Sequence, residues 1–441
     1  MAQVRDGFQS RLGFVLAASG AAVGLGNIWG FPTQAANHGG GAFLLVYFIV
    51  IFLLALPALY TELYLGHQAQ ANPVKALSSA WQDTAPKVGA AAGYIGLFGA
   101  IVMLSFYSIV AGWMLAYALE PVASFFGFSE LSNFLHSDSM ARNFVFTPLM
   151  LILTASIILK GVKSGIETWS RRLMPLLLVL LVALIAYIAT LDGAMDGFAA
   201  YLVPDFSQIL DANLIIAAMG QAFFSLSLGV GCMMVYGSYL KPDANLPKLT
   251  GTVALLDTGV AFLAGLLIIP AIFVAQHNGV EVFSGGKLVG EGQLIFAILP
   301  ELFSTMGQVG LLVGLLFFVL MSIASVTSTI SSTEIPVAFL VENHSVERKK
   351  ATLFVTLIVF IASSLIILNF DWLFGLVIMV LTQYQLPLMG LFYFITVGWL
   401  WQRGNKLHQV SSGPHYWFAQ YIRFVCPLLM TAVFVNVALL K

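Results

Sequence analysis

Long apolar segments are the feature that most restricts how this chain can fold. Eleven of them reach the length of about 20 residues that a helix needs to cross a bilayer. They lie at residues 12–36, 42–66, 88–124, 143–160, 172–191, 213–240, 250–276, 307–341, 350–369, 372–401 and 417–440. They are too long for barrel strands and do not alternate apolar with polar residues. We therefore expect an all-α integral membrane protein in which residues 1–441 form one transmembrane domain.

Composition agrees with this class and excludes others. Charged residues make up 9% of the chain, against about 25% in a typical soluble protein. The net charge of −1 gives no reason to expect nucleic-acid binding. Cys232 and Cys426 each lie in apolar sequence, so we expect neither a disulfide framework nor a cysteine metal site. The first apolar run leads into a glycine-rich stretch without a cleavage pattern, so we expect no cleavable signal peptide.

Lysine and arginine positions predict the orientation, because they concentrate on the cytoplasmic side of membrane proteins. If the N-terminus is cytoplasmic, 16 of the 19 Lys and Arg residues lie inside. Only Arg142, Lys287 and Lys441 then lie outside. With eleven spans the C-terminus is external. We expect a multi-pass protein of the plasma (inner) membrane, with the lipid bilayer as a partner.

The first segment contains a stretch that is poorly suited to a continuous helix. "GAAVGLGNIWGFP", residues 20 to 32, combines several glycines with Asn27 and Pro32. Glycine costs about 1 kcal/mol and proline about 3 kcal/mol in a helix relative to alanine. Gly20 and Gly24 also have the spacing of helix-packing contacts. Packing does not explain Asn27 and Pro32, so the pattern favours an unwound segment. The backbone N–H groups that unwinding frees can hold an anion, and the freed carbonyl groups can hold a small cation.

The sixth segment is interrupted in a similar way by "GQAFFSLSLGVGC", residues 220 to 232. Each interrupted segment is the first of a set of five, at residues 12–191 and 213–401. Paired interruptions at corresponding positions indicate an inverted-repeat transporter with its site at mid-membrane. We expect a 5+5 inverted repeat with helices 1 and 6 broken, followed by an eleventh helix at 417–440.

Several stretches resemble the neurotransmitter:sodium symporter family, in its bacterial amino-acid transporter branch. They are "RLGFVLAASGAAVGLGNIWGFP" with the following "NHGGGAFLLVYF", then "PALYTELYLG", "GQAFFSLSLGVG" and "SVTSTISSTEIPVAFL". The resemblance covers spans one to ten in order, and the count of eleven resembles bacterial members without a twelfth helix. It implies a LeuT-like fold and sodium-coupled import of an amino acid by alternating access.

The resemblance also implies two sodium sites. The first consists of Ala22, Asn27, Ser225 and Asp257, together with the carboxylate of the substrate. The second consists of Gly20, Val23, Ala324, Thr327 and Ser328. Serine and threonine hydroxyls in a membrane helix can instead bond back to the preceding turn. Uncharged oxygen ligands at matching positions nevertheless suit a weakly held monovalent cation.

The implied substrate site is lined by Ala22, Leu25, Gly26, Met103, Tyr107, Phe224, Ser225, Ser227, Val230, Thr329 and Ser332. Tyr107 matches the tyrosine that binds the substrate carboxylate, and Phe224 matches the aromatic lid. Monoamine carriers of the family have an aspartate where this chain has Gly24, so the substrate should bring its own carboxylate. No side chain of the set is charged, and a buried charge would lack a partner. We expect a neutral α-amino acid, with medium to large apolar or aromatic side chains favoured.

The gates agree with the family on one side only. The inner gate matches at Arg5, Ser238, Tyr239 and Glu342, the last in place of the usual aspartate. At the outer gate, relatives typically read "NIWRFP" and pair that arginine with an aspartate. Here the sequence is "NIWGFP", so Gly30 replaces the arginine while Asp371 remains.

Two further carboxylates lie within membrane segments, where they are costly and functional by default. The equivalent of Glu62 in the family supports unwound backbone. The sequence does not identify a partner for Glu334, and polar groups freed by the nearby Pro336 are one explanation for it.

Asp257 stands where relatives usually have an asparagine that binds the first sodium. A carboxylate this deep in a span should be paired with a cation or protonated. In chloride-dependent relatives a chloride ion sits near the residues that match Tyr47, Gln221 and Ser225. Those residues persist here, but Asp257 can supply the negative charge itself. We expect transport without chloride, and the sequence leaves open whether Asp257 is protonated on the return step.

Two other classes of function are alternatives to a carrier. A polytopic membrane enzyme, such as an intramembrane protease, is not indicated, because the spans contain no HExxH motif, no catalytic aspartate pair and no Gly-x-Ser-x-Gly motif. A channel is the second alternative, and sodium-driven accumulation of substrate separates it from a carrier. We expect a symporter that is not an enzyme, with Na⁺ at two sites and a neutral amino acid as its partners.

Overall fold

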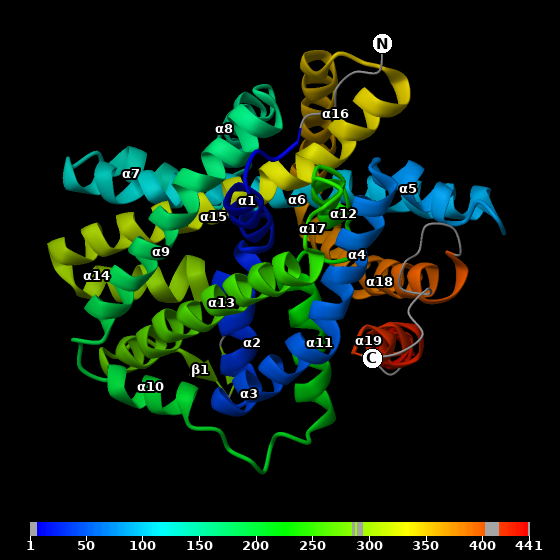
Figure 1. Ribbon diagram of the computed structural model, residues 1–441. Coiled ribbons are helices and arrows are strands. Elements are labelled where there is room, and N and C mark those ends of the chain that lie inside the picture. The colour runs from blue at the N-terminus through cyan, green and yellow to red at the C-terminus, as the bar shows by residue number, and fades with distance from the viewer. Residues whose placement is uncertain (1–6, 285–286, 289–293, 402–413, 440–441) are drawn as a thin grey trace.

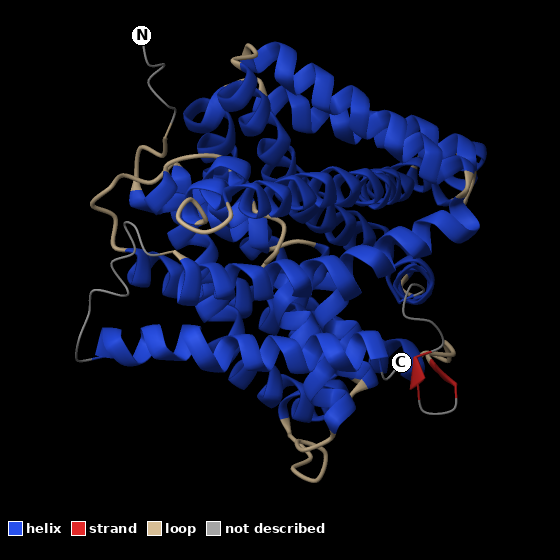
Figure 2. Cartoon of the chain, turned by 90° about the vertical axis from the view of Figure 1, so that its right-hand side faces the viewer, coloured by secondary structure: helices blue, strands red, loops and turns tan. Residues whose placement is uncertain are grey.

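The computed structural model describes residues 7–284, 287–288, 294–401 and 414–439. Almost all of this part of the chain is helical, and Figure 2 shows its one small hairpin at an edge of the helical body. The hairpin pairs β1 (Phe283–Ser284) with β2 (Lys287–Leu288) in antiparallel register. Several helices contain π-helical turns, which carry the label η.

Helices occupy each of the first five predicted segments. They are α1 (Arg11–Ala22), η1 (Gly26–Gly30) and α2 (Phe31–Asn37); α3 (Gly41–Val50), η2 (Ile51–Ala55) and α4 (Leu56–Ala69); α6 (Pro86–Phe125); α8 (Met140–Ile158); and η3 (Val162–Glu167) with α9 (Thr168–Ile188). Connecting helices are α5 (Pro73–Ala80), α7 (Ser129–His136) and α10 (Ala194–Leu202).

Helices also occupy the remaining six predicted segments. They are α11 (Ala212–Ser225) with α12 (Cys232–Ser238); α13 (Leu246–His277); α15 (Gly307–His344); α16 (Arg348–Leu368); α17 (Phe370–Met379), η5 (Val380–Gln385), α18 (Leu386–Ile395) and η6 (Thr396–Leu400); and α19 (Pro414–Gln420), η8 (Tyr421–Val425) and α20 (Cys426–Leu439). η4 (Leu294–Ile298) and α14 (Leu299–Thr305) connect α13 to α15.

Eight helices in the described residues are long and apolar enough to cross a membrane. The pair Arg11–Ala22 and Gly26–Asn37, bent by 54° at its break, makes nine. The sixth predicted segment is divided by the non-helical residues 226–231, and its longer part, α11, has only 14 residues. The exact number of eleven spans therefore stays a prediction, whereas the all-helical, multi-span class and the two broken helices are confirmed.

The broken first helix lies at the centre of the fold. Figure 1 shows α1 and α2 as a column in dark blue through the middle of the molecule, with α13 crossing it. α1 also packs against α15 and α9. The longest helices, α6 with 40 residues and α15 with 38, pack extensively against each other. The central position of the break means that protein, rather than lipid, covers its exposed backbone.

Glycines allow the second broken helix to pack closely on α4. A Cβ atom at Gly66 would lie 1.8 Å from the Met234 carbonyl oxygen, and one at Gly237 would lie 2.4 Å from the Leu63 carbonyl oxygen. The backbones of α4 and α12 therefore approach each other more closely than any larger residue permits. This contact fixes α12 directly beside Glu62, which lies on α4.

Candidate functional site

Backbone hydrogen bonds show how the first helix opens. Its last regular bond runs from the Val23 N–H to the Ser19 carbonyl, at 2.6 Å. The Gly24 N–H, which in a continuous helix would bond to Gly20, instead donates to Asn27 Oδ1 at 3.0 Å. The Leu25 N–H donates to the Tyr107 hydroxyl at 3.2 Å. The break therefore releases carbonyl oxygens near the end of α1, which are the ligand type that a small cation prefers.

Three predicted residues of the first sodium site meet directly. Asn27 Nδ2 donates to Ser225 Oγ at 2.8 Å and to Asp257 Oδ1 at 2.8 Å. Ser225 Oγ in turn donates to Asp257 Oδ2 at 3.0 Å. Asn27 and Asp257 are fully buried, and no Lys or Arg in the described part of the chain is paired with Asp257. The arrangement is a buried carboxylate held only by neutral donors, which favours a cation beside it.

The residues of the predicted second sodium site lie together where α15 passes the end of α1. Ser328 Oγ donates to the Val23 carbonyl at 3.4 Å, and a Cβ atom at Gly20 would lie 3.3 Å from the Thr327 Cβ. The Thr327 hydroxyl bonds back along its own helix, to the Ala324 carbonyl at 3.0 Å and the Ile323 carbonyl at 3.2 Å. The Thr327 hydroxyl therefore bonds back to the preceding turn of its own helix, whereas the Ser328 hydroxyl reaches across to the backbone of α1.

Gly24 and Gly26 are in contact with the residues predicted to hold the substrate. A Cβ atom at Gly24 would lie 2.5 Å from Ser328 Oγ and 2.8 Å from the Tyr107 hydroxyl. One at Gly26 would lie 3.2 Å from the Phe224 ring. There is thus no room for an aspartate side chain at position 24 in this arrangement. The backbone of the break faces Tyr107 and Phe224 directly.

The other predicted substrate residues divide into two groups. Ser227, in the non-helical stretch after α11, has φ of +52° and donates its hydroxyl to the Ala21 carbonyl at 3.2 Å. Val230 of the same non-helical stretch and Met103 of α6 are both buried. Thr329 differs, because its hydroxyl lies 2.8 Å from that of Thr154 on α8 and therefore points toward that helix. No hydrogen bond involves the side chain of the half-buried Ser332 in the described residues.

Glu62 supports the second helix break, as the resemblance implied. The carboxylate is almost fully buried on α4 and accepts hydrogen bonds from two backbone N–H groups, those of Gly229 and Met233, each at 3.1 Å. Gly229 and Gly231 have φ of +85° and +93°, a backbone conformation that larger residues rarely adopt. Glu62 thus satisfies N–H groups that a helix interruption would otherwise leave unpaired within the membrane.

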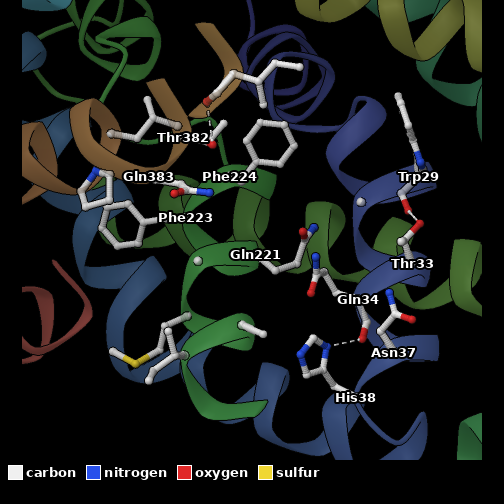
Figure 3. Close-up of a pocket in the computed structure, with 18 of the residues that line it drawn as sticks. Trp29, Thr33, Gln34, Asn37, His38, Gln221, Phe223, Phe224, Thr382 and Gln383 are labelled. Atoms are coloured by element: carbon white, nitrogen blue, oxygen red, sulfur yellow. Dashed lines mark hydrogen bonds between the residues drawn. The ribbon is translucent and has the colours of Figure 1, made fainter. Parts of the chain in front are cut away.

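A cavity of about 1120 Å³ leads to the first break. Figure 3 shows Thr33, Gln34 and Asn37 of α2 on one side of it, and residues of α11 and η5 on the other. We call it the vestibule, lined by residues that include Trp29, Thr33, Gln34, Gln221, Phe224 and Gln383. Leu25 and Tyr107 also line it, so the vestibule extends to the unwound segment and to the predicted carboxylate-binding tyrosine.

The predicted outer gate has no ionic pair at position 30. Gly30 lines the vestibule, where a Cβ atom would lie 3.1 Å from Gln221 Oε1. Gln221 Nε2 donates to the Gly26 carbonyl at 2.7 Å, so this amide occupies the space beside Gly30. Asp371 is exposed, and the described residues include no ion pair to it. In place of the arginine that relatives have at position 30, the uncharged amide of Gln221 fills the space beside Gly30.

At the opposite end, an ionic network around the buried Glu334 joins four helices. Arg348 Nη1 donates to Glu334 Oε1 at 3.1 Å, and Nη2 donates to Glu334 Oε2 at 2.5 Å. The Tyr239 hydroxyl, after α12, donates to Glu334 Oε1 at 2.6 Å, and Arg348 Nε donates to the Ile158 carbonyl of α8 at 2.9 Å. Arg348 is thus the partner of Glu334 that sequence reasoning missed, so groups freed by Pro336 are not needed to explain this acid.

The remaining predicted inner-gate residues lie at the same end. Glu342 Oε2 accepts hydrogen bonds from the backbone N–H and the side-chain amide of Asn72, at 2.8 Å and 2.9 Å. The Ser238 hydroxyl donates to the Val235 carbonyl. Phe8 is buried there and packs edge-to-face on the rings of Phe14, Tyr236 and Tyr239. Arg5 lies outside the described residues, so its predicted role is not tested.

Comparisons with known proteins identify what shares this architecture. The sodium:neurotransmitter symporter family matches residues 5–145 and 136–440. The uncharacterized sodium-dependent transporter YhdH of Bacillus subtilis is 32% identical, over 97% of this chain and 96% of its own length. The sodium-dependent nutrient amino acid transporter 1 of Drosophila grimshawi is 25% identical, over 98% of this chain and 76% of its own length. The crystal structure of MhsT in complex with L-phenylalanine superimposes with a TM-score of 0.83 and 34% identity, covering 98% of this chain and 100% of MhsT.

Proposed function

The chain belongs to the sodium:neurotransmitter symporter family, and from this premise we propose that it imports neutral α-amino acids together with sodium ions. It is a LeuT-fold, multi-pass membrane transporter, not an enzyme. Its relatives are sodium-dependent transporters, and the nutrient amino acid transporter among them supports an amino-acid substrate. The binding of L-phenylalanine by MhsT supports a neutral one with a large apolar side chain.

The contact between Asn27, Ser225 and Asp257 is the observation that carries the proposal. A fully buried carboxylate with only neutral hydrogen-bond donors is costly unless a cation joins it. We assign the first sodium to this group and to the Ala22 carbonyl. We assign the second sodium to the carbonyls of Gly20, Val23 and Ala324 with the hydroxyls of Thr327 and Ser328. Oxygen ligands with a single carboxylate suit a hard, monovalent cation.

The surroundings of Gly24 support a substrate that carries its own carboxylate. The site has no acidic side chain at this position, and the contacts of Ser328 and Tyr107 leave no space for one. The substrate carboxylate lies instead beside position 24, bound by the Tyr107 hydroxyl and the unwound backbone of Leu25 and Gly26. Met103, Val230 and Ser227 surround the side chain. None of them is charged, which disfavours acidic and basic amino acids.

We further propose that transport needs no chloride. Ser225, which matches a residue near the chloride ion of relatives, donates its hydroxyl to Asp257 Oδ2 at 3.0 Å. Because Asp257 already places a negative charge beside the first sodium site, a second anion near Tyr47, Gln221 and Ser225 is unnecessary. The proposal is contradicted if uptake collapses when chloride is replaced by gluconate at constant sodium.

The distribution of Lys and Arg supports an orientation in the membrane. With 16 of 19 Lys and Arg residues on one side, we propose that this side is cytoplasmic and that the vestibule opens outside. The N-terminus is then cytoplasmic, the C-terminus external, and the membrane is the plasma (inner) membrane. The whole chain acts as a single transporter domain, with the network around Glu334 at the cytoplasmic end.

Uptake into proteoliposomes tests the function. Purified full-length protein is reconstituted and supplied with each of the neutral, acidic and basic amino acids under an inward sodium gradient. We expect neutral amino acids to accumulate against their own gradient, and potassium in place of sodium to abolish accumulation. Equilibration without accumulation would indicate a channel. A preference for glutamate, lysine or a decarboxylated amine would overturn the substrate assignment.

A further inference from the structure

The side chain of Gln385, the last residue of η5, carries a polar group that the fold leaves unsatisfied. Its Nε2 atom is buried and has no hydrogen-bond partner in the described residues. A buried donor without a partner costs about 1–3 kcal/mol and calls for an explanation. The proposed sodium sites, both gates and the vestibule lining do not include this amide.

The amide lies against the backbone of α6. A Cβ atom at Gly99 would lie 2.2 Å from Gln385 Nε2 and 2.3 Å from its Oε1, so the carboxamide rests on this glycine. Any other residue at position 99 would displace it. Met103 is one turn along the same face of α6, and Tyr107 is one turn further. The amide therefore packs against the face of α6 that carries two proposed substrate residues, Met103 and Tyr107.

Two elements of the proposed substrate site, α6 and the non-helical residues 226–231, lie close to this amide. One turn below Gly99, a Cβ atom at Gly96 would lie 3.8 Å from the Val230 carbonyl oxygen. The Leu386 carbonyl, next to Gln385, would lie 2.5 Å from a Cβ atom at Gly229. The end of η5 thus packs on the non-helical stretch of the sixth segment as well as on α6. A Cβ atom at Gly96 would also lie 3.6 Å from the Met389 methyl group and 3.8 Å from the Tyr393 hydroxyl.

Distance along α6 relates the amide to the proposed substrate. Tyr107, which takes the carboxylate end, and Gly99 are eight residues apart, or about 12 Å at 1.5 Å per residue. A large amino acid held at Tyr107 with its side chain lying over Met103 points its far end toward Gln385. A carboxamide there can both donate and accept a hydrogen bond.

We propose that Gln385 is a specificity-determining residue that hydrogen-bonds a polar atom at the far end of the substrate side chain. The inference rests on the proposed function as a carrier of neutral amino acids. It predicts that side chains ending in a hydroxyl or an amide are favoured over those of equal shape without one. A site built to hydrogen-bond a substrate group discriminates strongly against an analogue that lacks the group, because its own polar atom stays unpaired.

Tyrosine and phenylalanine are the matched probes, because they differ by one hydroxyl. Each competes for sodium-dependent uptake in the full-length protein, in wild type and in the Gln385→Met and Gln385→Leu variants. We expect both variants to shift the affinity ratio by about fivefold or more toward phenylalanine, the worth of a typical net hydrogen bond, while phenylalanine affinity stays within about twofold. Gln276→Leu, which removes an exposed amide on α13, is the matched control and should leave the ratio unchanged.

The remaining outcomes each decide the matter. An unchanged ratio overturns the proposal, and so does an equal loss of both substrates, which would show a purely structural role for the amide. If neither variant binds phenylalanine, the amide has a structural role and the proposal is likewise overturned. If the wild type takes up no neutral amino acid at all, the proposed function itself fails, and this result is distinct from uptake with an unaltered ratio.

Discussion

Replacing Asp257 with asparagine separates the cost of its buried charge from the benefit it brings to sodium binding. The side chain is fully buried and accepts two side-chain hydrogen bonds, at 2.8 Å from Asn27 and 3.0 Å from Ser225. Bonds to a charged acceptor are worth about 1.5–3 kcal/mol each, or about 3–6 kcal/mol together. Burying a carboxylate costs several kcal/mol, so the two terms roughly cancel without a cation.

Sodium changes this balance, because two opposite unit charges about 4 Å apart attract by about 4 kcal/mol at an effective dielectric constant of 20. Asp257→Asn keeps the shape and an oxygen ligand but loses most of this attraction. After partial compensation by solvation, we expect the apparent sodium Kd to rise about 10- to 100-fold, which is about 1.4–2.8 kcal/mol. At saturating sodium, the stabilisation by the ion should fall by the same amount.

Thermal unfolding of the purified protein, titrated with sodium at constant ionic strength with potassium, measures both quantities. We expect the variant to have an unchanged or higher Tm without sodium and a much smaller rise in Tm on adding it. Asp196→Asn, at an exposed aspartate of α10, is the control for a general charge effect. A sodium Kd within twofold of the wild type, or a Tm several degrees lower without sodium, would refute the reasoning.

Three other changes test the remaining parts of the site. Thr327→Ala combined with Ser328→Ala should abolish sodium-driven uptake, and full transport at low sodium would contradict the second sodium site. Gly24→Asp should abolish amino-acid binding without creating amine transport, since a Cβ atom there would lie 2.5 Å from the Ser328 hydroxyl oxygen. Binding of phenylalanine by this variant would contradict the expected steric conflict. Arg348→Met should lower stability by about 3–5 kcal/mol, because it leaves the fully buried Glu334 carboxylate without its cation, whereas Glu334→Gln should cost less because the Arg348 side chain is 23% exposed. The double variant should lose clearly less stability than the sum of the two single variants, and additive losses in urea unfolding would show that the two side chains act independently.

The helix breaks show how far local sequence reasoning extends. The run of glycines with Asn27 and Pro32 predicts the end of α1, and α1 does end at Ala22. Gly229 and Gly231 likewise adopt the left-handed backbone that their residue type permits. Such breaks are predictable because the cost of glycine and proline in a helix arises within a few residues of each site.

Side-chain pairing was predicted less completely. Family resemblance placed Asn27, Ser225 and Asp257 in one group, and they are in contact. It also placed Thr329 beside the substrate, whereas its hydroxyl lies against Thr154 of α8. A resemblance transfers positions along a helix, but the direction of a hydroxyl depends on which neighbouring helix offers the better partner.

The sequence by itself determined the membrane class, the helical content and the positions of both breaks, since these depend on hydrophobicity and backbone cost along short stretches of chain. Only the tertiary structure decided that Glu334 pairs with Arg348 on the next helix and that the Gln385 amide rests on Gly99. Both contacts depend on the depth and rotation of packed helices. Those quantities are set by the fit of many side chains at once, and no local pattern in the sequence encodes them.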